Sequence, residues 1–152
     1  MTSPYDFTAE DWDQVTIAPM LVGLAVAKAE DSGFFGSMRE TRTLLSTIAD
    51  EVTDNPAAGL INAAAVADTE ERVKGLSAAG PDVLGEAAVN ACRELAAILD
   101  RTATAEEADG FKAWIVSIAV AVAEAAKETD VRVSPAESAL IDRVRAALLT
   151  EA

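Results

Sequence analysis

An apolar run occupies residues 114–123, in the C-terminal third of the chain. Ser117 is its only polar side chain, and Ser117, Glu124 and Glu128 follow one another at spacings of seven and four, which places them on one narrow stripe of a helix. A helix that is apolar on its other sides is usually surrounded by other elements. We therefore expect the helix that contains this run to lie at the centre of the fold. The run is too short, and too soon followed by charge, to span a bilayer.

A second largely apolar segment lies near the N-terminus. Residues 12–31 have the spacing of a helix and carry no charged side chain from Val15 to Ala27. Pro19 lies inside this segment, and proline lacks the backbone N–H that a helix interior needs, so it predicts a kink or two abutting helices. Residues 8–11 (Thr-Ala-Glu-Asp) are typical of a helix start.

Capping signals mark the starts of further helices. Residues 37–40, 104–107 and 134–137 each have the pattern Ser/Thr-x-x-Glu, a capping box in which the hydroxyl accepts a backbone N–H and the glutamate reaches back. Asn55-Pro56 and Gly80-Pro81 are typical of a helix end followed by a helix start. The helices predicted by these signals cover residues 37–52, 57–79, 82–103, 104–126 and 134–148.

No segment alternates apolar and polar residues with the period of a strand. We therefore predict an all-α fold, a single-domain bundle of six or seven helices over residues 1–152. Hydrophobic residues make up 51% of the chain and charged residues 25%, which is the composition of a globular protein with a sizeable core.

Acidic residues outnumber basic ones, with 26 Asp and Glu against 12 Lys and Arg, which gives a net charge of −14. A field of this sign repels phosphate backbones and anionic lipid headgroups, so the sequence predicts no nucleic-acid and no membrane partner. Cations and proteins with a basic surface are better partners. A solvated acidic surface that keeps the protein soluble explains the same charge without any partner.

The chain has no histidine and a single cysteine. Without histidine, the commonest general base and the commonest ligand for zinc, copper and haem are missing. Cys92 lies in an Ala-rich helical stretch, so we expect a buried thiol rather than a nucleophile. No nucleophile motif or carboxylate pair stands out, so no catalytic residue is assigned and the sequence leans against an enzyme. Residues 1–10 lack the regions of a standard secretion signal, so we expect a cytoplasmic protein.

Residues 21–30 and 115–124 resemble each other, with six identities in ten positions. Each block continues into an acidic loop, a Ser-x-x-Glu box and a helix with two adjacent aliphatic residues. We interpret them as two pseudo-symmetric helical hairpins, at approximately residues 12–52 and 112–148, with an Ala-rich helix pair at residues 56–103 between them. The first helices of the two hairpins should then be the two most buried helices and should pack together.

The two hairpins resemble the tellurite-resistance TerB-like family. The family pattern is an aliphatic-x-x-aliphatic-Ala helix, an acidic turn similar to Ala-Asp-Gly, and a glutamate that opens the next helix. The second hairpin keeps the usual spacing from Asp130 to Glu137, with Val131 in place of the glycine, whereas the step from Asp31 to Glu40 is two residues longer than usual. The resemblance implies an all-helical fold, acidic sites that bind divalent cations, and a link to stress response.

Acidic residues gather at both predicted hairpin turns, and we take them as candidate metal ligands. Calcium and magnesium bind several oxygen ligands, which loop carboxylates that face a helix start would supply. Capping boxes and a solvent-exposed helix stripe explain four of the same residues without a metal. The candidate ligands are Glu30, Asp31 and Glu40 at the first turn, and Glu124, Glu128, Asp130 and Glu137 at the second.

Two functions of different class follow from these observations. The leading hypothesis is a non-enzymatic, TerB-like module that binds a divalent cation, calcium or magnesium, or acts as an acidic adaptor for a protein partner with a basic surface. The alternative is a small hydrolase or ligand-binding bundle with a carboxylate-lined pocket between the two hairpins. Two close carboxylates in an internal pocket would favour the alternative, and carboxylates at open turns would favour the leading hypothesis.

Overall fold

The structure, a computed structural model, describes residues 2–29, 54–66, 80–126 and 135–149. Within these ranges the chain forms a short 3-10 helix, five α-helices and no strand, so the all-α prediction is confirmed. The helix predicted at residues 37–52 lies outside the described ranges, and the total of six or seven helices stays a prediction. The helices are η1 (Pro4–Asp6), α1 (Ala9–Ala29), α3 (Ala58–Val66), α5 (Pro81–Thr102), α6 (Ala105–Ala126) and α7 (Pro135–Leu149).

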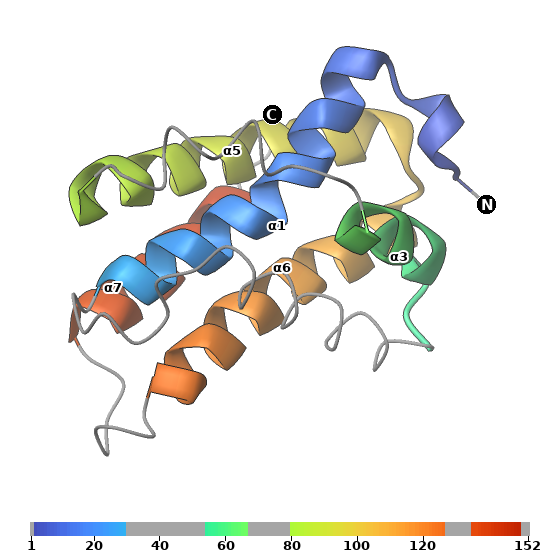
Figure 1. The fold of residues 1–152 in the computed structure, drawn as a ribbon. Coiled ribbons are helices and arrows are strands. Elements are labelled where there is room, and N and C mark those ends of the chain that lie inside the picture. Colours follow the sequence, from blue (N-terminus) through green and yellow to red (C-terminus); the bar gives the residue numbers. More distant parts are fainter. Residues whose placement is uncertain (1, 30–53, 67–79, 127–134, 150–152) are drawn as a thin grey trace.

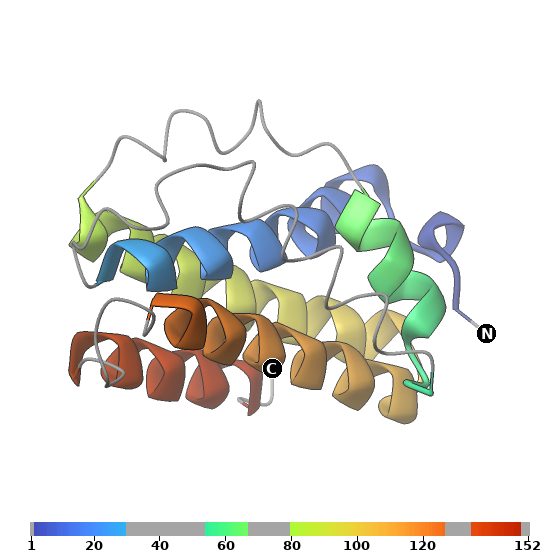
Figure 2. The same ribbon diagram turned by 60° about the horizontal axis from the view of Figure 1, so that its bottom comes forward.

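Four of the α-helices run side by side and form the body of the molecule (Figure 1). α1 and α5 are antiparallel and make the most extensive contact, and α1 also packs against α6 and α7. α7 contacts α5 and α6 as well, and the short helix α3 packs on α1 and on the first turns of α6 (Figure 2). Among the described helices, none is both long enough and apolar enough to cross a membrane.

α1, rather than α6, is the helix that is covered on every side. Every residue from 18 to 26 is buried, which takes α1 through more than two full turns without an exposed face. α6 buries Ile115 and Ile118 completely but leaves Ser117 exposed and Val116 partly exposed. The expectation that residues 114–123 form the central helix is therefore corrected, because Ser117 is exposed and Val116, Val120 and Ala121 are only partly buried.

The two similar helices, α1 and α6, are in contact with each other, as the internal resemblance predicted. They are not set apart from the rest by burial, since α5 also buries a long row of aliphatic side chains, among them Leu84, Leu95 and Leu99. The second helix of the first hairpin lies outside the described residues. The pseudo-symmetric arrangement of two hairpins therefore stays a prediction.

Pro19 lies inside α1 without dividing it. α1 is a single helix from Ala9 to Ala29, so the prediction of two abutting helices is wrong, while a kink at Pro19 stays a prediction. A proline within a helix removes one backbone hydrogen bond and crowds the carbonyl of the residue four positions earlier, here Val15, at a cost of about 3 kcal/mol. Pro19 and Val15 are both buried, so packing from the surrounding helices offsets this local cost.

Side-chain caps begin α1 and α6 where the sequence predicted them. Thr8 Oγ1 accepts a hydrogen bond from the backbone N–H of Asp11 at 3.1 Å. At α6, Thr104 Oγ1 accepts from Glu107 N and Glu107 Oε1 accepts from Thr104 N, both at 3.2 Å, which confirms this capping box.

Two further helices begin at a proline, a residue that suits the first helical position because its missing N–H would have no partner there. α5 begins at Pro81 after Gly80, one residue before the predicted start at Asp82, and α7 begins at Pro135. The capping box of residues 134–137 is not tested, because Ser134 and the Glu137 side chain are not described. The box of residues 37–40 lies outside the described ranges.

Asn55 joins the start of α3 to α6. Its Oδ1 accepts a hydrogen bond from Ala57 N at 2.8 Å, which agrees with its predicted capping role, and its Nδ2 donates to the backbone oxygen of Gly110 at 3.0 Å. A Cβ on Gly110 would overlap Asn55 Oδ1 and approach Ala57 N. Glycine at this position therefore allows α3 to lie close against α6.

Replacing Gly110 with alanine should destabilise the protein, although alanine is the better helix former. The new Cβ displaces Asn55 and removes two hydrogen bonds worth about 0.5–1.5 kcal/mol each, which together with the steric overlap outweighs a gain in helix propensity of about 1 kcal/mol. We expect a net loss of about 1 kcal/mol or more in urea unfolding.

Gly85→Ala is the matched control for this substitution. Its Cβ would lie in α5 and meet only Leu140 Cδ1, at an ordinary contact distance of 3.7 Å. This variant should gain up to about 1 kcal/mol from helix propensity. Equal gains in both variants would contradict the close approach of α3 to α6.

Candidate functional site

The seven predicted metal ligands are not placed by the structure. Glu124 lies in α6 and Glu137 in α7, but their side chains are not described. The other five lie outside the described ranges: Glu30, Asp31, Glu40, Glu128 and Asp130. Within the described ranges, no three Asp, Glu, Cys or His side chains lie close enough together to hold a metal ion. The metal sites at the hairpin turns therefore stay a prediction.

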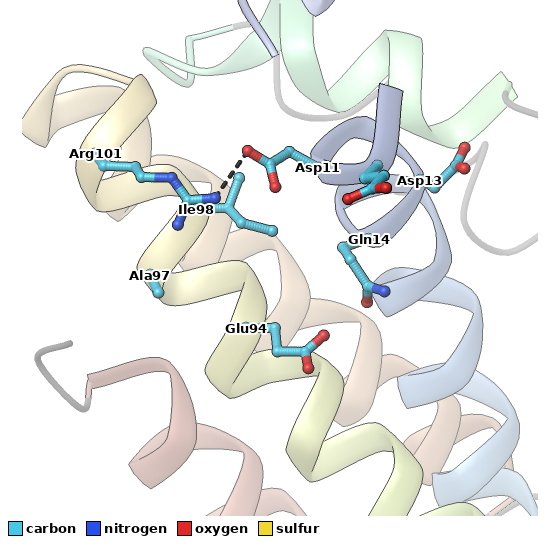
Figure 3. A pocket seen from close by; sticks show the side chains of 8 residues that line it. Asp11, Asp13, Gln14, Glu94, Ala97, Ile98 and Arg101 are labelled. Atoms are coloured by element: carbon cyan, nitrogen blue, oxygen red, sulfur yellow. Dashed lines mark hydrogen bonds and ion pairs between the residues drawn. The ribbon is translucent and has the colours of Figure 1, made fainter. Parts of the chain in front are cut away.

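A cleft opens between the first turns of α1 and the C-terminal half of α5, and we call it the α1/α5 cleft (Figure 3). Its volume is about 440 Å³ and it is open to solvent. Four carboxylates and one guanidinium line it, which leaves an excess of negative charge. The lining residues are Glu10, Asp11, Asp13 and Gln14 from α1, and Glu94, Ala97, Ile98 and Arg101 from α5.

Arg101 and Asp11 bridge one end of the α1/α5 cleft. Arg101 Nη2 lies 2.8 Å from Asp11 Oδ2, and the two side chains are 57% and 21% exposed. Because solvent screens this pair, it contributes at most about 1 kcal/mol to stability. In Figure 3, Gln14 and Glu94 extend into the gap between the helices next to this pair, whereas Asp13 lies on the outer side of α1. The interior of the cleft is therefore left with the Glu94 carboxylate and the Gln14 amide.

The charges of the cleft follow from the antiparallel packing of α1 and α5. The N-terminus of a helix carries a partial positive charge that favours Glu10 and Asp11 in the first turn of α1. The C-terminus carries a partial negative charge that favours Arg101 in the last turn of α5. Antiparallel packing brings these two ends together, and Ile98, which is 4% exposed, lies at the base of the cleft as an apolar surface.

Sequence reasoning did not find the α1/α5 cleft. Glu10 and Asp11 were interpreted only as part of a helix start, and Glu94 was not singled out. Ninety residues separate Asp11 from Arg101, and nothing in a single sequence pairs positions so far apart. The one available signal is that two long predicted helices carry acids in a first turn and an arginine in a last turn.

Glu107 is buried, with 5% of its surface exposed, and it holds the N-terminal arm (residues 2–8, before α1) against α6 through Thr2. Besides its capping box with Thr104, it accepts hydrogen bonds from Thr2 N at 2.9 Å and from Thr2 Oγ1 at 2.6 Å. Burial raises the pKa of Glu107, but the hydrogen bonds from Thr2 and Thr104 together favour the charged form more strongly and lower the pKa to about 2. This carboxylate is therefore ionised at neutral pH and acts as an acceptor.

Two other buried groups belong to the core. Cys92 is a buried free thiol, as predicted, and burial raises its pKa to about 12, so it is neutral and a poor nucleophile at neutral pH. Trp114 packs edge-on against Phe111, with ring centroids 5.3 Å apart. The buried Nε1 of Trp114 has no hydrogen-bond partner in the described part of the chain. Neither group lines the α1/α5 cleft.

Comparison of this chain with protein-family models, curated proteins and solved structures gives no match. The resemblance to the TerB-like family therefore rests on the residues of the two hairpins alone. The geometry and charge of the α1/α5 cleft are what a functional proposal can draw on.

The Thr2–Glu107 contact should make the stability of the fold depend on pH in the acid range. The pKa of Glu107 is about 2 in the folded protein against an ordinary value of 4.5. A lowered folded-state pKa stabilises the fold fully above the ordinary value, and this stabilisation is lost as the pH falls toward 2. We expect it to amount to about 1–2 kcal/mol, below the full linkage value, because Thr2 lies in a partly exposed arm.

Urea unfolding of the parent and of Glu107→Gln at about pH 6 and about pH 3 measures this contribution. The free energy of unfolding of the parent should exceed that of Glu107→Gln by less at the lower pH. Thr2→Val removes only the Oγ1 donor, so its free energy of unfolding should lie between those of the two proteins. Glu106→Gln is the control, since Glu106 is an exposed neighbour in the same turn. If the difference in free energy of unfolding between the parent and Glu107→Gln were equal at both pH values, the lowered pKa of Glu107 would be contradicted.

Proposed function

We propose that this protein is a non-enzymatic helical module that binds a basic segment of a protein partner in the α1/α5 cleft. The observation that carries the proposal is the charge of the cleft, whose lining holds four carboxylates against one guanidinium and leaves Glu94 inside it beside the Asp11–Arg101 pair. The whole chain has the same sign, with a net charge of −14. A field of this kind attracts a basic partner and steers its approach to the acidic surface.

The lining of the cleft suits a lysine or arginine side chain. Ala97 and Ile98 offer an apolar surface for the methylene stem, while the charged head reaches the carboxylate of Glu94. Gln14 adds an amide that faces the same gap (Figure 3). Arg101 gives an internal example of such a contact, because its guanidinium already pairs with Asp11 across the gap between the helices.

A single divalent cation suits this cleft less well than a basic segment does. Calcium and magnesium need several oxygen ligands in one coordination shell. The cleft carboxylates do not converge in this way, since no three described acidic or thiol groups lie close enough to share an ion. Carboxylates spread along two helices instead match a ligand whose positive charges are also spread out, such as a lysine-rich peptide.

Glu94→Gln should weaken the binding of a hexalysine peptide about two- to fivefold, because the loss of one partly exposed ion pair costs about 0.5–1 kcal/mol. The matched control is Asp142→Asn, which removes the same charge from an exposed position on α7 outside the cleft. Isothermal titration calorimetry at about 0.1 M salt measures both affinities.

The control variant separates the cleft from the general charge of the surface. Raising the salt to about 0.5 M should weaken the binding of the parent and reduce its difference from Glu94→Gln. If Asp142→Asn weakened binding as much as Glu94→Gln did, only the net charge would matter and the cleft would not be the site.

We further propose, as a second function, the TerB-like role in stress response or tellurite resistance, with a cation bound at the hairpin turns. One observation favours it: α1 and α6 pack against each other, as the first helices of two paired hairpins would. α6 and α7 are also in contact, and residues 127–134 connect them, as the predicted second hairpin requires. The candidate ligands at this turn are Glu124, Glu128, Asp130 and Glu137.

Asp130→Asn tests the cation proposal, because Asp130 lies outside the predicted capping box of residues 134–137. If the turn binds calcium or magnesium, either ion should raise the melting temperature of the parent by mass action, and by less in the variant. Sodium chloride at matched ionic strength is the control for screening of the net negative charge. Equal shifts in parent and variant would end the cation proposal for this turn and leave the cleft proposal unaffected.

A further inference from the structure

A second concave surface lies between α6 and α7, and we call it the α6/α7 groove. It has a volume of about 520 Å³ and a mainly apolar lining that includes Val116, Leu148 and Leu149. Leu148 is 1% exposed and forms the base of the groove, whereas Leu149, at the end of α7, is 78% exposed. A mainly apolar concavity that is rimmed by charged residues and has an exposed leucine at its edge suits contact with another molecule.

Two charged residues that line the groove have no partner among the residues that the structure describes. Asp109 in α6 and Arg145 in α7 are both exposed, and neither makes an ion pair or a hydrogen bond within the described part of the protein. Lys112, which also lines the groove, is engaged with Asp100 at 2.8 Å. The groove therefore presents one free negative charge and one free positive charge, on different helices.

We propose that a second copy of this chain occupies the α6/α7 groove and forms a twofold-symmetric dimer. In a twofold contact the same surface is used by both copies, so each pair of contacting residues occurs twice. Arg145 of one copy pairs with Asp109 of the other, and Leu149 of each copy covers the apolar base of the opposite groove. A surface that carries one charge of each sign, neither paired within the described part of the chain, is complementary to a second copy of itself.

The charges of the molecule disfavour other occupants of this groove. A basic segment would meet a single carboxylate here, beside the two cations Lys112 and Arg145. An acidic segment would pair with Arg145 but place a like charge beside Asp109. A second copy satisfies Asp109 and Arg145 together, which neither kind of segment does.

The size of the face indicates a weak dimer. α7 has 15 residues and is therefore about 22 Å long, and two helices side by side are about 20 Å wide. A face of this size buries roughly 900 Å² in total over the two copies, which is the range of weak, transient complexes. We therefore expect a dissociation constant of roughly 10–100 μM. Because both copies are acidic, added salt should strengthen the dimer by screening their repulsion. Binding of a basic segment in the α1/α5 cleft responds to salt in the opposite direction.

Sedimentation equilibrium of the full chain tests the dimer over a range of concentrations, at about 0.05 M and about 0.5 M salt. The average mass should rise with concentration toward twice that of the monomer, and more readily at the higher salt. Leu149→Asp should weaken self-association at least tenfold. Tyr5→Asp is the matched control, because Tyr5 is 97% exposed in η1, outside the groove, and should leave self-association unchanged.

A charge exchange identifies the pairing across the twofold axis. Asp109→Arg and Arg145→Asp should each weaken the dimer about five- to twentyfold, because either one places like charges opposite each other twice, and the double variant should restore it. Circular dichroism and urea unfolding check that each variant is folded.

A parent that stays monomeric at millimolar concentration in both salts would overturn the proposal. So would equal effects of Leu149→Asp and Tyr5→Asp, a double variant weaker than both single ones, or a groove that binds a hexaglutamate peptide instead.

Discussion

The burial of α1 on all sides is the constraint on which the rest of the structure depends. Residues 18–26 are buried without exception, so α5, α6 and α7 must each cover a different part of the same helix. Small side chains such as Ala18, Val22 and Ala25 meet them and allow the helix axes to approach closely. Larger side chains at these positions would force the neighbours apart. The same close packing keeps α1 helical through Pro19.

Because the middle of the bundle is apolar, several polar contacts that join distant parts of the chain gather at one end of it. Arg101 pairs with Asp11, Glu107 binds Thr2, and Asn55 binds the backbone of Gly110. These contacts bring the N-terminal arm, the starts of α1, α3 and α6, and the end of α5 to the same region (Figure 1). The α1/α5 cleft opens within this region, so its acidic lining is carried by helix ends that other contacts already hold in place.

The two surfaces for which we propose partners differ in the force that would make them bind. The α1/α5 cleft is lined mainly by charged side chains with a small apolar surface at its base. The α6/α7 groove is mainly apolar and carries one unpaired charge of each sign among the described residues, Asp109 and Arg145. The two surfaces lie on different helix pairs and share no lining residue. A dimer formed through the groove would therefore keep both clefts accessible and present two acidic sites to one partner, which raises avidity without any new contact.

The sequence by itself determined the all-α class, several helix starts and the sign of the net charge. Local signals were enough for this, such as the capping box from Thr104 to Glu107, the Gly80-Pro81 step and the Ala-rich surroundings of Cys92. The candidate metal ligands at the hairpin turns, such as Asp130, were also chosen from local pattern, and no described contact bears on them. The cleft, by contrast, could not be predicted, because each of its acids is unremarkable within its own helix.

Only the tertiary structure decided which helix is central. Residues 21–30 and 115–124 are similar in sequence, yet residues 18–26 of α1 are all buried whereas α6 leaves Ser117 exposed. It also decided that Pro19 lies within one helix and that Asp11 meets Arg101 across ninety residues of chain. Periodicity and capping act over a few residues, whereas helix packing joins surfaces that are distant in the sequence, so the second cannot be derived from the first.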